Sequence, residues 1–152
     1  MNPAATNEMP MREAAARVAE FFETLTPASL DQLDALYAPQ AYFKDPFNEV
    51  RGLAGIRQIF SHMYEALEQP RFVVTSCIVD GAQCFLTWDF NFRFKSYDRL
   101  TVQTVRGGSH LTFNADGLLD FHRDYWDADE ELYEKLPVVG GLMRWLKKRA
   151  RQ

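Results

Sequence analysis

The feature of the sequence that most constrains its fold is a change in the spacing of apolar residues near Arg71. Before Arg71, apolar residues recur every three to four positions, which predicts helices over residues 12–25, over residues 29–37 and in the segment after Gly52. After Arg71, apolar and polar residues alternate through four longer segments, which predicts strands. Helices followed by a run of strands are typical of an α+β domain, in which an antiparallel sheet packs against helices.

The first two long strands are predicted to form a hairpin, because the turn dipeptide Asp80-Gly81 separates them. Cys77 and Cys84 flank this turn and would face each other across it. We expect two free, buried thiols rather than a disulfide, since the two residues also suit a reducing compartment. Without a nearby histidine they make a poor metal site.

A shorter strand is predicted over residues 41–44, where Asp45-Pro46 ends it because proline has no N–H for the ladder. Asp45 has two interpretations. Its carboxylate can cap the turn through backbone amides, or it can act as an acid or base toward a ligand. The local sequence leaves both open.

The chain is expected to form one domain, since 152 residues is a typical domain length and no repeat or linker divides it. We predict a disordered lead over residues 1–11, the domain over residues 12–128 and a helical extension over residues 129–152. A helix in the extension would have an apolar face and a basic face, formed by Leu142, Trp145 and Leu146 and by Arg144, Lys147, Lys148, Arg149 and Arg151. Such a helix can contact an anionic membrane surface, or it can dock on its own sheet or a partner subunit.

The overall charge and the missing motifs exclude several function classes. A formal net charge of −4 lacks the basic surface that nucleic-acid binding needs. Neither a membrane-spanning apolar run nor a signal peptide is recognisable, so we expect a cytoplasmic protein. Phosphate-binding glycine loops, nucleophile elbows and zinc-protease motifs are missing, so we expect no cofactor and no metal. His62 and His110 are predicted to be surface or core residues without an obvious partner.

The strand predicted over residues 84–94 carries an unusually aromatic face. Alternation places Leu86, Trp88, Phe90 and Phe92 on one side of it. Such a face can form the wall of a small-molecule cavity, or it can belong to an ordinary aromatic core.

The last predicted strand, residues 118–126, has two faces that compete for burial. One face carries Leu119, Phe121, Arg123 and Tyr125, and the other carries Leu118, Asp120, His122, Asp124 and Trp126. Periodicity alone favours burial of the first face. If the second face is inside, His122 and Asp124 can form a hydrogen-bonded acid/base pair.

Several motifs together resemble the nuclear transport factor 2-like superfamily, in its SnoaL-like and ketosteroid-isomerase-like branch. They are Tyr37-Ala38, Asp45-Pro46, Gly52-Leu53 and the turn and strand over residues 113–127. The resemblance covers roughly residues 12–128. It implies a cone-shaped, strongly curved antiparallel sheet wrapped around the N-terminal helices, a deep apolar pocket and a homodimer.

The resemblance also implies a set of site residues, because it turns the His122 face of the last strand into the pocket. Asp45 matches the base of ketosteroid isomerases, whose two tyrosines correspond to Phe21 and Phe60 and whose acid corresponds to Ser109. Asp124 matches one catalytic aspartate of limonene-epoxide hydrolase. The implied catalytic residues are Asp45, Asp124 and His122, and the implied substrate-binding residues are Phe21, Tyr37, Phe60, Trp88, Phe90, Phe92, Ser109 and Trp126.

Three functions remain open at this point. The chain can be an isomerase, cyclase, hydratase or hydrolase that performs acid/base chemistry on an apolar substrate. It can instead bind or carry an apolar metabolite or lipid, with Asp45 capping its turn and Asp124 paired with Arg123 or another basic group. Weak contact with a membrane surface rests on the basic C-terminal helix alone.

Overall fold

The computed structural model describes residues 3–96, 98–131, 148 and 150 of the chain. These residues form three α-helices, one 3-10 helix and six strands. In chain order the elements are α1 (Pro3–Glu23), the 3-10 helix η1 (Pro27–Ala35), β1 (Tyr37–Lys44), β2 (Glu49–Arg51), α2 (Leu53–Ala66), β3 (Leu67–Asp80), β4 (Gln83–Phe94), β5 (Gln103–Phe113), β6 (Leu119–Tyr125) and α3 (Ala128–Glu131).

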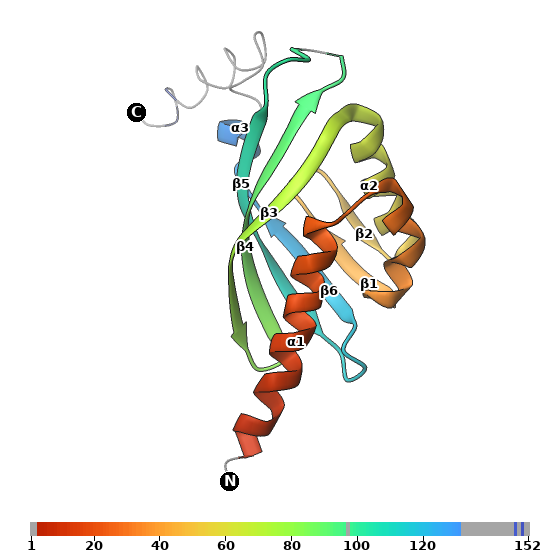
Figure 1. Cartoon of the computed structure of the whole chain (residues 1–152), viewed down its shortest axis with the longest axis vertical. Coiled ribbons are helices and arrows are strands. Elements are labelled where there is room, and N and C mark those ends of the chain that lie inside the picture. The colour runs from red at the N-terminus through yellow and green to blue at the C-terminus, as the bar shows by residue number, and fades with distance from the viewer. Residues whose placement is uncertain (1–2, 97, 132–147, 149, 151–152) are drawn as a thin grey trace.

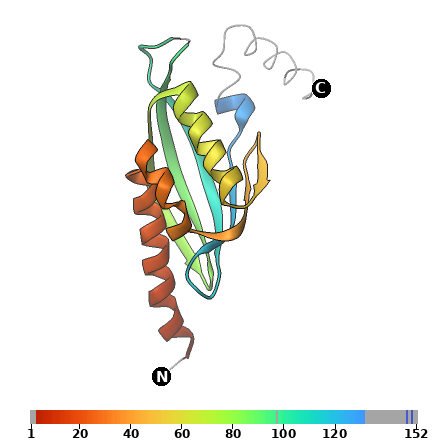
Figure 2. The same ribbon diagram turned by 90° about the vertical axis from the view of Figure 1, so that its right-hand side faces the viewer.

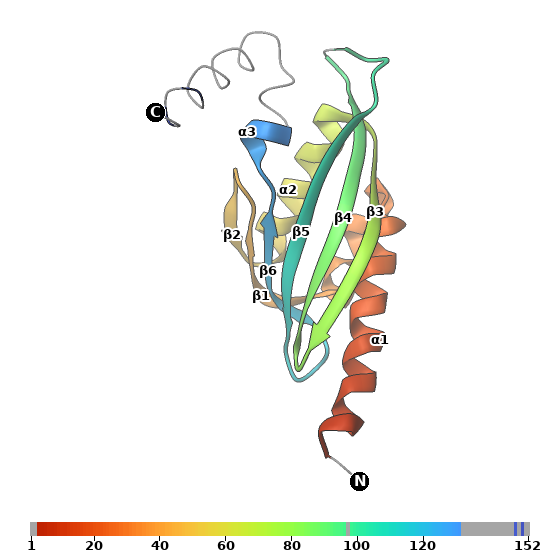
Figure 3. The same ribbon diagram turned by 90° about the vertical axis from the view of Figure 1, so that its left-hand side faces the viewer.

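The six strands form one curved, open sheet in the order β2-β1-β6-β5-β4-β3 (Figure 1). Helices α1 and α2 cover one face of this sheet (Figure 2), whereas Figure 3 shows its other face. The predicted α+β fold with helices inside a curved sheet is confirmed. One detail of the prediction is wrong, because β1 and β6 run parallel while the other neighbours are antiparallel.

Helix α1 is longer than the sequence predicted. A disordered lead was expected through residue 11, whereas α1 begins at Pro3 and continues through Pro10. The alanine-rich residues after Pro10 are strong helix formers, and proline removes only one hydrogen bond of the helix. Farther along, α1 buries Ala14, Ala15, Val18 and Phe22 against the sheet.

The segment after α1 forms a 3-10 helix rather than the predicted α-helix over residues 29–37. Its N-cap is Thr26, whose backbone N–H donates to Ser29 Oγ at 3.1 Å. Leu30, Leu33 and Leu36 are buried, and their spacing of three residues matches the three residues per turn of a 3-10 helix. Tyr37 then belongs to β1, which begins before the predicted strand over residues 41–44.

The hairpin of β3 and β4 forms as predicted, with Asp80 opposite Gln83. Its two cysteines are free, but they differ from the prediction in position and burial. Cys84 is buried opposite Val79, and Cys77 is exposed and lies opposite Leu86. Burial raises the pKa of the Cys84 thiol to about 12.

Strand β6 contains a bulge that explains why both of its faces looked suitable for burial. On β5, Phe113 pairs with Leu119 and Thr112 pairs with Phe121, so Asp120 is an extra residue in the strand. The extra residue reverses the alternation. Leu119 and His122 are therefore both buried, although they lie three positions apart.

The predicted C-terminal amphipathic helix lies outside the described residues, apart from the exposed Lys148 and Ala150. Among the described residues, no helix combines the length and the apolar composition that a membrane span requires.

Candidate functional site

A cavity of about 390 Å³ lies between α2, the β1–β2 loop and the aromatic face of the sheet. This volume is within the usual range for small-molecule sites. The described lining consists of Phe43, Asp45, Phe47, Asn48, Ile59, Phe60, His62, Met63, Ala66, Leu67, Phe72, Trp88, Phe90, Phe92, Phe94, Val105, Asp124 and Trp126.

A small chamber of about 20 Å³ adjoins the main cavity and shares Phe60, Phe72, Trp88 and Asp124 with it. Its remaining lining residues are Phe22, Val74, Leu86, Ser109 and His122. Asp124 therefore lines both spaces, with 16% of its side chain exposed. A chamber of this size holds about one water or one methyl group.

A chain of hydrogen bonds crosses the sheet behind the cavity and ends on Asp124. Tyr37 Oη lies 2.6 Å from His122 Nδ1, and His122 Nε2 lies 2.7 Å from Asp124 Oδ1. On the other side, Trp88 Nε1 donates to Ser109 Oγ at 2.9 Å, and Ser109 Oγ donates to Asp124 Oδ1 at 2.5 Å. Four side chains from β1, β4, β5 and β6 thus hold one carboxylate.

The acceptor character of Asp124 fixes the direction of the hydrogen bonds that reach it. A carboxylate only accepts hydrogen bonds, so His122 donates from Nε2 to Asp124 Oδ1, while its Nδ1 lies within hydrogen-bond distance of the Tyr37 hydroxyl. Both hydrogen bonds to Asp124 end on Oδ1, and no described residue donates to Oδ2.

Burial and aromatic packing surround His122 on several sides. His122 is 2% exposed. The centre of its ring lies 4.6 Å from the ring centre of Phe43 and 5.6 Å from that of Phe22. Burial raises the pKa of the Tyr37 phenol well above its usual 10.0, and the charge of Asp124 raises it further. Tyr37 consequently stays protonated.

Trp88 reaches Ser109 because glycine lies opposite it on β5. Gly107 pairs with Trp88, and a Cβ at Gly107 would lie 2.5 Å from the Trp88 ring. Only a residue without a side chain leaves room for the indole there.

Asp45 also lines the cavity, but its carboxylate is engaged in its own turn. Its Oδ1 accepts from the backbone N–H of Phe47 at 2.8 Å and of Asn48 at 2.7 Å. The Asn48 side-chain amide donates to Oδ1 at 3.0 Å and to Oδ2 at 3.1 Å. The geometry is that of a capped Asx-type turn.

The other predicted site residues are mostly brought together. Phe60, Trp88, Phe90, Phe92 and Trp126 line the main cavity, and Ser109 lines the chamber. Tyr37 is fully buried behind His122 and contributes through it. Phe21 lines neither space. Its neighbour Phe22 lines the chamber, one position away from the residue predicted from the resemblance.

Sequence reasoning missed several lining residues, of which His62 is the most informative. Ile59, His62, Met63 and Ala66 share one face of α2, so the helical spacing of the sequence could have identified them. His110 is also different from the prediction. It lies near the opposite face of the sheet and has a partner, Gln83 Oε1, at 2.8 Å from its Nε2.

Asp124 was expected, as one alternative, to pair with Arg123 or another basic group; its partner of that kind is His122, not Arg123. The Arg123 guanidinium lies 4.7 Å from the centre of the Tyr125 ring, to which it is stacked, and the partners of Asp124 are His122 and Ser109. Within the part of the chain that the structure describes, no group of three or more His, Cys, Asp or Glu side chains could hold a metal ion.

A curved sheet with helices on its inner face and an aromatic cavity beneath them is the architecture of the nuclear transport factor 2-like class of α+β proteins. Within this class, a family model described as a SnoaL-like domain matches residues 18–122. The chain belongs to the SnoaL-like domain family.

Solved structures with the same fold share little sequence with this chain. One is a hypothetical protein from Catenulispora acidiphila with a ketosteroid isomerase-like fold, solved in complex with trimethylamine. It has a TM-score of 0.66 and 16% identity over 79% of this chain and 89% of its own. An LEH-like epoxide hydrolase from M. tuberculosis has a TM-score of 0.65 and 17% identity over 79% of this chain and 86% of its own. A third structure comes from Jannaschia sp. CCS1 and is proposed to be a SnoaL-like polyketide cyclase. It has a TM-score of 0.66 and 16% identity over 84% of this chain and 90% of its own.

At these identities the likeness shows the fold alone. No functionally curated protein matches the chain by sequence.

Proposed function

We propose that this chain is an enzyme that performs acid/base chemistry on an apolar small molecule, with Asp124 as the group that moves the proton. The observation that carries the proposal is the arrangement of Asp124. Its Oδ1 is held by His122 and Ser109, while Oδ2 has no donor among the described residues and the side chain lines an aromatic cavity. The reaction class is an isomerisation, cyclisation, hydration or hydrolysis.

In the proposed mechanism, Asp124 accepts a proton from an acidic C–H of the substrate or from an attacking water. The carboxylate becomes a neutral acid and then returns the proton to another atom of the substrate, so no net charge accumulates. Positioned groups of this kind contribute roughly 10²- to 10⁴-fold to rate.

The remaining residues have supporting roles. His122 donates to Asp124 and so stabilises the carboxylate between proton transfers, while Tyr37 positions the His122 ring through its Nδ1. Asn48 and His62 are the other polar side chains in the described lining besides Asp45, and they are candidates to contact a substrate carbonyl or hydroxyl. Asp45 orders the cavity wall through its turn rather than reacting.

The comparisons support a small-molecule site in this fold, since related structures include an epoxide hydrolase and a protein in complex with trimethylamine. A binder or carrier is the alternative. It is favoured by the engagement of Asp45, which leaves Asp124 as the one carboxylate with an unoccupied oxygen in the described lining. A cytoplasmic location and a homodimer remain predictions.

Gently purified protein provides the test. Small molecules that copurify are identified by mass spectrometry, and the protein is then incubated with them. We expect a product to appear, and we expect Asp124→Asn to slow its formation at least 100-fold, because the amide keeps the hydrogen bonds but cannot accept the proton.

Asp120→Asn on the same strand is the matched control, since Asp120 is exposed and should leave the rate unchanged. A bound molecule that is never converted would support the carrier instead. Undiminished conversion by Asp124→Asn would overturn the assignment of Asp124.

A further inference from the structure

The charges around the main cavity are strongly asymmetric. Its described lining contains two carboxylates, Asp45 and Asp124, and no lysine or arginine. His62 is the one side chain in this lining that can carry a positive charge. An anionic ligand would therefore meet like charges at short range, in surroundings of low dielectric.

Among the described residues, no lysine or arginine pairs with either carboxylate. Asp45 accepts from backbone amides and from the Asn48 side chain. Asp124 accepts from the Ser109 hydroxyl and from the His122 ring. Such donors stabilise each carboxylate locally, but they leave a negative potential in the cavity.

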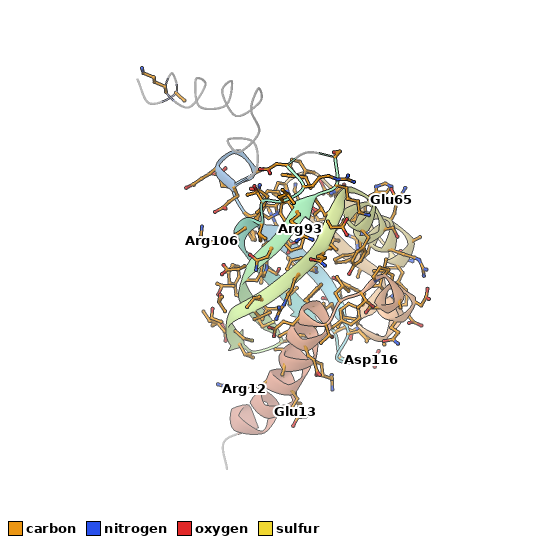
Figure 4. The ribbon with its side chains drawn as sticks, turned by 45° about the horizontal axis from the view of Figure 1, so that its top comes forward. Arg12, Glu13, Glu65, Arg93, Arg106 and Asp116 are labelled. Atoms are coloured by element: carbon orange, nitrogen blue, oxygen red, sulfur yellow. The ribbon has the colours of Figure 1, made fainter. Side chains whose placement is uncertain are left out.

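Three cationic side chains that directly adjoin cavity residues in the sequence point elsewhere. Arg93 and Arg106, labelled in Figure 4 on β4 and β5, occupy the face of the sheet that carries Asp89 rather than Trp88. Lys95 directs its ammonium group to the carbonyl oxygen of Tyr64, at 2.7 Å. None of these three residues lines the cavity.

Aromatic rings form most of the remaining wall. Phe72 lies between Trp88, at 5.4 Å edge-on, and Phe90, stacked at 4.3 Å. At the other side Phe47 and Trp126 pack edge to face at 5.4 Å. Ring faces carry partial negative charge and attract cations, and quaternary ammonium groups are recognised by such aromatic walls.

We propose that the cavity binds a tertiary or quaternary ammonium compound, that is, an alkylated amine with an apolar remainder. A primary ammonium group has three N–H donors, whereas Asp124 Oδ2 is the one carboxylate oxygen of the described lining without a hydrogen bond. A tertiary ammonium has one N–H to satisfy and a quaternary ammonium has none. Alkyl groups on the nitrogen pack against the rings, and the small chamber beside Asp124 admits one methyl group.

This inference rests on the proposed function, since it names the substrate class of the same cavity. Three probes with the same branched head separate charge from shape: choline, the uncharged 3,3-dimethylbutan-1-ol and the anion 3,3-dimethylbutanoate. We expect choline to bind about ten-fold more tightly than the alcohol, and the carboxylate to bind most weakly. Isothermal titration calorimetry or protein-observed NMR measures the three affinities.

Variants connect the preference to the carboxylates. Asp124→Asn and Asp45→Asn should each reduce the choline-to-alcohol ratio several-fold, whereas the exposed Asp120→Asn should leave it unchanged. Equal affinities for choline and the alcohol, tighter binding of the carboxylate, or no binding of choline would overturn the proposal. A cation preference without turnover would contradict the proposed enzyme alone, and turnover without a cation preference would contradict only the ligand class.

Discussion

Asp45 and Asp124 line the same cavity, but the chain supports them in different ways. Asp45 is held by residues two and three positions ahead of it, through the backbone amides of its own turn and the Asn48 side chain. Asp124 is held by Ser109 on the neighbouring strand and by His122, which Tyr37 supports from β1.

Position in a cavity does not by itself decide the role of a carboxylate. Both Asp45 oxygens accept hydrogen bonds that fold the turn, whereas Asp124 keeps Oδ2 without a donor among the described residues. A support assembled from distant residues allows one oxygen to be fixed and the other to face a ligand. The Asp124 network should therefore matter both for stability and for function, and the Asp45 turn mainly for local structure.

Truncation of His122 should cause the largest loss of stability. His122→Ala removes a buried ring from between Phe22, Phe43 and Tyr37 and leaves the Tyr37 hydroxyl without its hydrogen-bond partner. The cavity and the unsatisfied group together should lower the free energy of unfolding by about 3–5 kcal/mol. Urea denaturation followed by circular dichroism measures the change.

His110→Ala is the control for that experiment, because His110 lies near the opposite face of the sheet and bonds only to Gln83 among the described residues. It should cost less than about 1 kcal/mol. Equal losses in the two variants would mean that the buried network contributes no special stability.

Gly107→Ala tests the network from the opposite end. The added Cβ would lie 2.5 Å from the Trp88 ring and would push the indole away from Ser109. Overpacking of this kind costs about 1–3 kcal/mol, and it should also shift the Trp88 fluorescence spectrum.

Gly81→Ala is the control. Gly81 is a turn glycine with a φ of 57° and no close neighbour, so an alanine there strains only the backbone and the spectrum should not change. An unchanged spectrum in Gly107→Ala would show that Trp88 is not held as described.

Tyr37→Phe removes one hydroxyl from the network and should cost about 1–2 kcal/mol at neutral pH. Burial first, and then Asp124, raise the pKa of Tyr37 in the folded chain above its unfolded value of 10.0. The folded state thus holds the proton more tightly, so stability is complete below pH 10 and falls as the pH rises toward the folded-state pKa. The slope is at most about 1.4 kcal/mol per pH unit for one group.

Denaturation curves between neutral pH and pH 11 test the sign of this effect. Because the phenylalanine side chain of the variant cannot ionise, the stability difference between the wild type and Tyr37→Phe should shrink above pH 10. A difference that stays constant over this range would contradict the raised pKa of Tyr37.

Much of the fold could be predicted because its signals are local. The change of period near Arg71 separates helices from strands, and the Asp80-Gly81 turn defines the hairpin. The errors occur where a short pattern has two solutions. A leucine every three residues suits the 3-10 helix η1 as well as a short α-helix, and one extra residue at Asp120 reverses the faces of β6.

The site was less accessible from sequence because its contacts cross four strands. The turn role of Asp45 follows from neighbouring residues and could be anticipated. The Asp124 network depends on which residue of β5 lies opposite Asp124 and on the parallel pairing of β1 with β6, and neither is encoded in a local pattern. The resemblance to the superfamily indicated the correct face of β6 for His122 and Asp124, but it selected Phe21 where Phe22 lines the chamber.

The smallest predicted effect concerns the Asp45 turn, where the same chemistry is purely local. Asp45→Ala removes the acceptor of two backbone amides and should cost about 1 kcal/mol, whereas Asp45→Asn keeps an oxygen acceptor and should cost only a few tenths. Urea denaturation of both variants provides the comparison, with the exposed Asp120→Asn as a reference for the loss of one negative charge. If Asp45→Asn were as destabilising as Asp45→Ala, the negative charge rather than the hydrogen-bond geometry would hold the turn, and Asp45 would resemble Asp124 more closely than its contacts indicate.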